Sequence, residues 1–85
     1  MNTVFLLMAE YESPTIPLVP VAEKYLQMSE RKAKNLASTQ ELPFPVLRGG
    51  ESQKSGWFVH IDDLARYIDM QREKARDQWN NFHRD

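Results

Sequence analysis

The stretch that decides the fold is FPVLRGGESQKSGWFVHIDDLA, residues 44–65. Val46–Arg48 and Trp57–Ile61 are rich in residues that favour extended structure, so they predict two strands. Gly49-Gly50 gives the backbone the freedom that a turn between them requires. Asp62 is the expected N-cap of a following helix. The stretch therefore predicts a polar-tipped β-hairpin joined to a helix, which is the arrangement of the wing in a winged helix-turn-helix.

The chain before the hairpin begins with a short apolar helix. Asn2 or Thr3 is expected to cap it, and it is expected to run to about Tyr11. Ser13-Pro14 is expected to end it, because a proline disfavours helical geometry in the residue before it. The apolar face is expected to hold Phe5, Met8 and Ala9, with Leu6 and Leu7 beside them.

Two further short helices are predicted between this helix and the hairpin. Ile16 is expected to be a short extended piece, and Pro20 places the start of the next helix near Leu18 or Val19. Gln27-Met28 is expected to turn the chain. Ser29 is then a suitable N-cap for a helix over residues 30–38. Two helices joined by a tight turn form a helix-turn-helix.

The helix over residues 30–38 has one narrow apolar edge, made by Ala33, Leu36 and Ala37. A recognition helix docks by such an edge and leaves its polar side to contact DNA. A solvated surface helix is the alternative interpretation. The polar side consists of Arg31, Lys32, Lys34, Asn35 and Ser38.

The last helix is expected from about Asp63 towards Phe82. An apolar line continues along it, through Leu64, Ile68, Ala75, Trp79 and Phe82. Twenty residues of helix span about 30 Å, which is more than one small domain covers. We therefore expect Ala75, Trp79 and Phe82 to form a dimerisation element with the same helix of a second copy. The alternative is a tail that folds back onto its own core.

Size and composition indicate one soluble domain over residues 1–85, with residues 69–85 as a C-terminal helical extension. The net charge is −1, but residues 30–54 carry +2 while the flanking parts are negative. Phosphate binding depends on the local field, so this central basic region can suffice for contact with nucleic acid, but on charge alone an ordinary solvated face is the preferred interpretation. No apolar run approaches the ~20 residues of a membrane span. The absence of cysteine fits a reducing bacterial cytoplasm, with the nucleoid as the expected location.

The residues that carry chemistry predict no enzyme. His60 lies in an apolar strand, His83 lies near the C-terminus, and the pair lacks metal-ligand spacing. Asp62 and Asp63 are explained by the start of a helix. We therefore expect no catalytic residue, no metal and no cofactor.

A DNA-binding function is favoured instead. Arg31 can reach guanine and Asn35 can read adenine, while lysines neutralise phosphates. Ser29 at the helix start can present its hydroxyl and free backbone N–H groups to a phosphate. The residues expected to contact double-stranded DNA are Ser29, Arg31, Lys32, Lys34, Asn35 and Ser38 on the helix, and Arg48, Ser52, Gln53, Lys54 and Ser55 on the hairpin.

The chain resembles the pyocin activator protein (PrtN) family. The resemblance rests on residues 2–11 (NTVFLLMAEY), on residues 42–48 (LPFPVLR), on the hairpin tip SQKS at 52–55 and on residues 59–69 (VHIDDLARYID). It implies sequence-specific DNA binding that supports transcription, and it points most clearly to Ser52–Ser55. The order of strand, wing and helix is also similar to phage excisionases and to the head domain of MerR-type proteins.

The expected fold class is therefore α+β, mainly α: a winged helix-turn-helix with a two-stranded wing and a long C-terminal helix. The expected function is a transcription activator of phage or bacteriocin genes that acts as a homodimer, with RNA polymerase as a further candidate partner. Two alternatives stay open. One is an excisionase-like factor that bends DNA. The other is a small protein that docks on a host protein through Trp79, Phe82 and the last helix.

Overall fold

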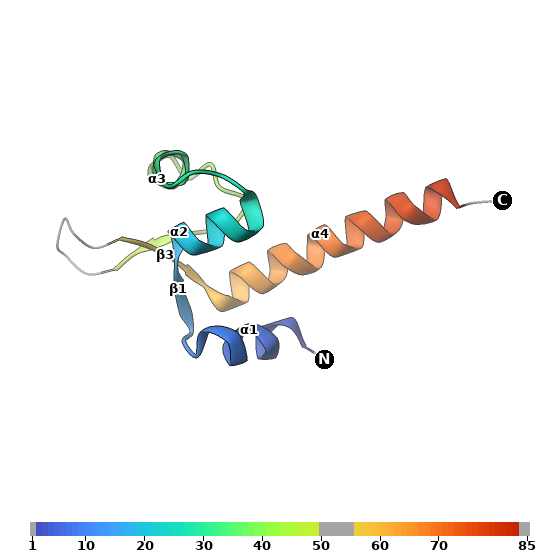
Figure 1. Cartoon of the computed structure of the whole chain (residues 1–85), viewed down its shortest axis with the longest axis horizontal. Helices are drawn as coiled ribbons and strands as arrows, with labels where there is room; N and C mark the ends of the chain where they lie inside the picture. Colours follow the sequence, from blue (N-terminus) through green and yellow to red (C-terminus); the bar gives the residue numbers. More distant parts are fainter. Residues whose placement is uncertain (1, 50–55, 84–85) are drawn as a thin grey trace.

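The computed structural model describes residues 2–49 and 56–83. In this part of the chain the protein is mainly helical, with one small antiparallel sheet and a long C-terminal helix (Figure 1). The elements in chain order are α1 (Thr3–Tyr11), β1 (Thr15–Pro17), α2 (Leu18–Val21), η1 (Ala22–Leu26), α3 (Glu30–Ser38), β2 (Leu47–Arg48), β3 (Trp57–His60) and α4 (Ile61–Phe82).

Helix α1 has the predicted bounds, but the apolar face predicted from Phe5, Met8 and Ala9 is exposed. The side chain of Asn2 caps it by accepting a hydrogen bond of 2.8 Å from the backbone N–H of Val4. Its end is set by Glu12, whose left-handed backbone lets its N–H bond the carbonyl of Met8. The expectation that Ser13-Pro14 ends the helix did not include this cap at Glu12. Leu7 is the buried residue, whereas Phe5 is 65% exposed.

The helix after β1 begins at Leu18, so Pro20 falls in the first turn as predicted. It widens into a π-helical turn at η1, which ends at Gln27 with a left-handed backbone. The predicted turn at Gln27-Met28 is thus confirmed. Ser29 then caps α3 by accepting a hydrogen bond of 3.2 Å from the N–H of Lys32.

The sheet has three strands, in the order β1-β3-β2, and both pairings are antiparallel. Ile16 pairs with Val59, and Leu47 pairs with Phe58. The prediction of a two-stranded hairpin is correct for β2 and β3. The short extended piece expected at Ile16 is β1, but its pairing with β3 was not predicted. A three-residue strand is too short for its partner to be identified from alternation of side chains.

The junction between β3 and α4 differs from the prediction. Ile61 begins the helix instead of ending the strand, and His60 is the N-cap in place of Asp62. The Nδ1 atom of His60 accepts a hydrogen bond of 3.1 Å from the backbone N–H of Asp62. Asp62 and Asp63 lie in the first turn, where their charges complement the helix dipole.

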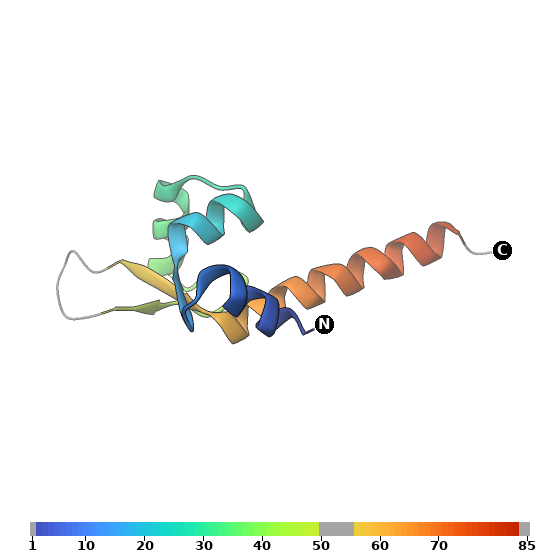
Figure 2. The ribbon, with the colours of Figure 1, turned by 60° about the horizontal axis from the view of Figure 1, so that its bottom comes forward.

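The core lies where the sheet, α1, α2, α3 and the first part of α4 meet (Figure 2). Apolar side chains from every helix contribute to it, and among the described residues none of the buried ones is polar or charged. Phe44 packs edge-on against Tyr67, with ring centroids 5.5 Å apart. This contact ties the segment before β2 to α4. The largest fully buried side chains are Ile16, Leu18, Val21, Val59, Ile61 and Leu64.

The second half of α4 projects from the body of the domain (Figures 1 and 2). Every described residue from Asp69 onward is exposed, including Trp79 at 60% and Phe82 at 88%. The alternative in which this tail folds back onto its own core is therefore wrong. No helix among residues 2–49 and 56–83 combines the length and the apolar character that crossing a bilayer requires.

Candidate nucleic-acid interface

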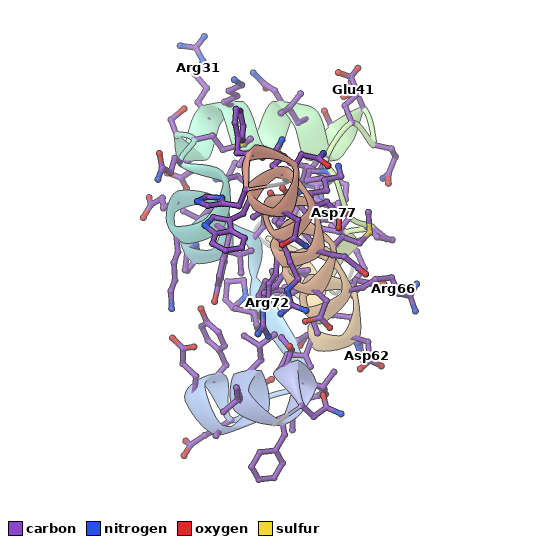
Figure 3. All side chains as sticks on the ribbon, turned by 90° about the vertical axis from the view of Figure 1, so that its right-hand side faces the viewer. Arg31, Glu41, Asp62, Arg66, Arg72 and Asp77 are labelled. Carbon is purple, nitrogen blue, oxygen red and sulfur yellow. The ribbon has the colours of Figure 1, made fainter. Side chains whose placement is uncertain are left out.

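Helix α3 separates its apolar and polar residues onto two sides. Ala33 and Ala37 are fully buried, and Leu36 is half-buried beside them. Small alanines let the backbone of α3 approach the core closely. The opposite side is exposed throughout and carries all the α3 residues predicted to contact DNA, namely Arg31, Lys32, Lys34, Asn35 and Ser38. Figure 3 shows Arg31 projecting outward at the edge of the molecule, on the far side of the body from α1.

Local contacts leave most of this polar side turned to solvent. Lys34 forms an ion pair of 3.0 Å with Glu30, one helical turn earlier. The hydroxyl of Ser38 donates a hydrogen bond of 2.8 Å to the backbone carbonyl of Asn35. This contact involves only the backbone of Asn35 and leaves its side-chain amide out. Within the described part of the chain, Arg31 and Lys32 form no ion pair. An exposed pair such as Glu30–Lys34 contributes only about 0.3–0.5 kcal/mol, so an incoming phosphate could exchange with Glu30.

The hairpin carries another residue of the predicted site, Arg48, at its base. The guanidinium of Arg48 lies over the ring of Trp57, 5.4 Å from the centroid. The two residues are also direct partners in the β2–β3 register. The backbone N–H of Gly49 donates a hydrogen bond of 3.3 Å to the carbonyl of Gly56, which continues the ladder beyond β2. The predicted contacts at Ser52, Gln53, Lys54 and Ser55 lie outside the described residues.

A groove of about 300 Å³ lies between α3 and the base of the hairpin. Glu30 and Lys34 line one side of it, and Trp57 and Phe58 line the other. The remaining lining residues are Pro17, Leu18, Val19 and Gly56. The sequence did not predict this groove, because its walls come from three segments that are distant in the chain. The two neighbouring aromatic residues in a short strand were the only available signal.

One lysine outside the predicted site has a structural contact. The ammonium group of Lys24 on η1 donates a hydrogen bond of 2.7 Å to Glu10 on α1. This hydrogen bond is the main reason why the pKa of Lys24 is raised above its ordinary value. Nearby, burial raises the pKa of the Tyr11 hydroxyl, and the neighbouring Tyr25 and Glu10 add to the effect. Lys24 therefore joins two helices and does not belong to the α3 surface.

The predicted dimerisation residues lie apart from this interface. Ala75, Trp79 and Phe82 are on the projecting tail of α4, while α3 and the hairpin lie towards the opposite end of the molecule (Figure 1). Within residues 2–49 and 56–83, no group of three His, Asp or Glu side chains is placed to hold a metal ion.

These features define a small, mainly helical domain with a three-stranded antiparallel sheet and one exposed helix of basic character. A model of the family described as pyocin activator protein PrtN matches residues 3–75. The chain therefore belongs to this family, and membership indicates a role in the activation of transcription. Searches among curated proteins and among solved structures returned no match. The family match ends at Ala75, before Trp79 and Phe82.

Proposed function

We propose that this member of the PrtN family activates transcription by binding double-stranded DNA as a winged helix-turn-helix. In this proposal α3 enters the major groove and the β2–β3 hairpin contacts the neighbouring backbone. Arg31 and Asn35 read base edges, and Lys32, Lys34 and Arg48 neutralise phosphates.

The order of the elements supports the proposal. A first helix and strand are followed by two helices joined at a tight turn and then by a β-hairpin. The first strand pairs with the second strand of the hairpin, so the sheet order is β1-β3-β2. This order supports the proposed winged helix-turn-helix, in which α3, the second helix of the pair, would be the recognition helix.

The groove between α3 and the hairpin carries the proposal. Lys34 lines it together with Trp57 and Phe58, so the polar side of α3 and the base of the hairpin border one surface. Arg48 is held at that base by Trp57. A single duplex can therefore meet the helix and the hairpin at the same time, which two surfaces on opposite sides of the domain would not allow.

The decisive experiment measures DNA affinity at two salt concentrations with fragments of the genome that encodes the protein. Specific binding is expected to a small subset of fragments, and the affinity is expected to fall steeply as salt increases. Lys32→Ala is expected to weaken binding to all sequences and to reduce the slope of log K against log salt by about one. Asn35→Ala is expected to relax the preference at one base pair.

Arg31 and Arg66 make a matched pair for the control, because both are exposed arginines. Arg31 lies on α3, and Arg66 projects from a different side of the molecule on α4 (Figure 3). Arg31→Ala is expected to lower the affinity by tenfold or more, whereas Arg66→Ala is expected to change it by less than about threefold. Equal losses in the two variants would indicate general charge attraction. Unchanged affinity in both Arg31→Ala and Lys32→Ala would exclude the proposed interface.

A further inference from the structure

We propose that the protein forms a two-fold symmetric dimer in which the tails of α4, residues 69–83, pack antiparallel against each other. The proposal concerns the free protein and does not depend on DNA binding. The proposed partner for the uncovered face of the tail is a second copy of the same chain.

The face in question continues the buried side of α4. Leu64 is fully buried and Ile68 is half-buried against the body of the domain. Spacings of three, four and seven residues keep Ala75, Trp79 and Phe82 on this same side of the helix. Trp79 is nevertheless 60% exposed and Phe82 is 88% exposed. A face that is core-forming in its first half is therefore left without a partner in its second half.

The position of the body selects the antiparallel arrangement. Ile61, Leu64 and Ala65 are buried, so the body covers this face over the first turns of α4. In a parallel pair, the two bodies would lie on the same face at the same end of the helix pair, where they would collide. In an antiparallel pair, each body lies beyond the end of the other tail. Apart from the hydrogen bond of 2.6 Å that Thr3 of α1 donates to Asp69, the tail extends away from the body, which leaves room for this pairing (Figures 1 and 2).

The flanks of the face supply a specific contact. Arg72 and Trp79 are two helical turns apart, so they lie along the same edge of the face. Like edges meet in an antiparallel helix pair, and full overlap of residues 69–83 brings Arg72 opposite the partner's Trp79. One side of the Trp79 indole is stacked on His83, with centroids 4.0 Å apart. The other side is available for the guanidinium, and symmetry makes this cation–π contact twice.

The available area predicts a dimer of modest strength. If a large aromatic side chain buries roughly 200 Å², Trp79 and Phe82 together offer about 300 Å² per copy. A standard interface buries about 800 Å² per partner, so the flanking polar residues must supply the rest. We therefore expect a dissociation constant on the order of micromolar and a monomer–dimer equilibrium that dilution displaces.

Sedimentation equilibrium without DNA, over about 1–300 µM protein, tests the association. Trp79→Ala and Phe82→Ala are each expected to raise the dimer dissociation constant more than tenfold. Arg72→Ala is expected to raise it by about fivefold or more, because two cation–π contacts are lost. Circular dichroism of each variant checks that α4 remains helical.

Met70 provides the matched control. It is apolar and 51% exposed on the same helix, and nine residues place it on the opposite side from Trp79. Met70→Ala is expected to leave the dissociation constant within about twofold. A wild-type protein that stays monomeric at every concentration would overturn the proposal. So would a dimer that Trp79→Ala and Phe82→Ala leave intact.

Disulfide cross-linking tests the orientation, because the chain has no cysteine of its own. With residues 69–83 fully overlapped, the two copies of residue 75 are separated by about 3 Å along the helix axis, and the two copies of residue 71 by about 15 Å. A disulfide needs its Cα atoms within about 7 Å. Ala75→Cys is therefore expected to cross-link and Gln71→Cys is not. Cross-linking of both variants would indicate a parallel pair, and cross-linking of neither would exclude pairing through α4.

Discussion

Gly49 and Gly56 are joined by one backbone hydrogen bond, yet their surroundings differ sharply. A Cβ atom added at Gly49 would lie 2.7 Å from Cε2 of Phe58, whereas a Cβ at Gly56 would meet no atom within 4 Å. Close approach to an aromatic ring is thus the reason for glycine at position 49. At position 56 the structure shows no such constraint.

Substitution of these two glycines should have opposite effects on stability. Gly49→Ala is expected to displace the Phe58 ring and to lower the free energy of unfolding by about 1–3 kcal/mol. Gly56→Ala is expected to be neutral or to raise it by up to about 1 kcal/mol, because the unfolded chain loses freedom. Urea denaturation of both variants measures the difference. Equal stabilities would show that Phe58 moves aside without loss.

His60 gives a second residue-level prediction, since its ring nitrogen caps α4. His60→Ala is expected to lower the free energy of unfolding by about 1 kcal/mol, because the N–H of Asp62 loses its acceptor. His60→Asn retains an acceptor at the cap and should recover most of that loss. Urea denaturation at neutral pH compares the three proteins. If the asparagine variant is as unstable as the alanine variant, the cap is not the cause.

The sequence favoured Asp62 for this role because aspartate is a strong N-cap and histidine is not. The strand in fact ends one residue earlier than predicted, because Ile61 already begins α4, although its N–H still bonds the carbonyl of Pro14 at 2.9 Å in register with the β1–β3 pairing. That contact is made by a segment almost fifty residues away. A local pattern of residue preferences contains no information about it.

Among the elements, α3 was predicted with its bounds and its cap because each signal is local. Ser29 precedes the helix, Glu30 suits its first turn, and the alanines recur at helical spacing. The partner of β1 could not be predicted for the opposite reason. Three extended residues carry no register, and pairing with β3 is decided by tertiary packing. The groove beside α3 depends on that same packing.

Ser29 allows stability and binding to be separated. Ser29→Ala is expected to lower the free energy of unfolding by about 1 kcal/mol, because the cap to Lys32 is lost. Ser29→Asp keeps a capping oxygen and should retain the stability of the natural protein. Its added negative charge at the proposed interface should nevertheless weaken DNA binding by tenfold or more. Urea denaturation and the DNA titration are run on the same samples.

A result in which Ser29→Asp binds DNA as tightly as the natural protein would place the start of α3 away from the phosphates. Loss of binding in Ser29→Ala alone would instead indicate that folding of α3 is what limits affinity. The two variants therefore distinguish a contact from a structural requirement.

At the scale of the whole molecule, the division between body and tail has a thermodynamic consequence. Residues 71–83 are all exposed and lie outside the core, so ending the chain after Ala75 should change the free energy of unfolding of the monomer by less than about 1 kcal/mol. The melting temperature of the full chain should rise with protein concentration, because only the folded state associates. The melting temperature of the shortened chain should not depend on protein concentration. Differential scanning calorimetry at several concentrations measures both.

The apolar line along α4 was predicted correctly, and so was its excess length over one small domain. The sequence did not determine whether the tail returns to its own core, because either arrangement would cover the same side chains. The structure decides this point at Ile68, where α4 leaves the body. It also shows that Phe5, Leu6 and Met8 of α1 face outward. The sequence could not predict which side of α1 is exposed, because apolar residues occur on all sides of that helix.

The π-helical turn at η1 gives the chain one place where its length can change. A π-turn holds an additional residue compared with an α-turn, and here Glu23 and Lys24 within it are exposed. Deletion of one residue there would convert η1 into an ordinary helical turn without moving α3 from the core, with loss only of the exposed hydrogen bond between Lys24 and Glu10. The same deletion inside α3 would rotate every later side chain by about 100° and bury charge. A variant of this protein that is one residue shorter should therefore carry the gap between Ala22 and Leu26.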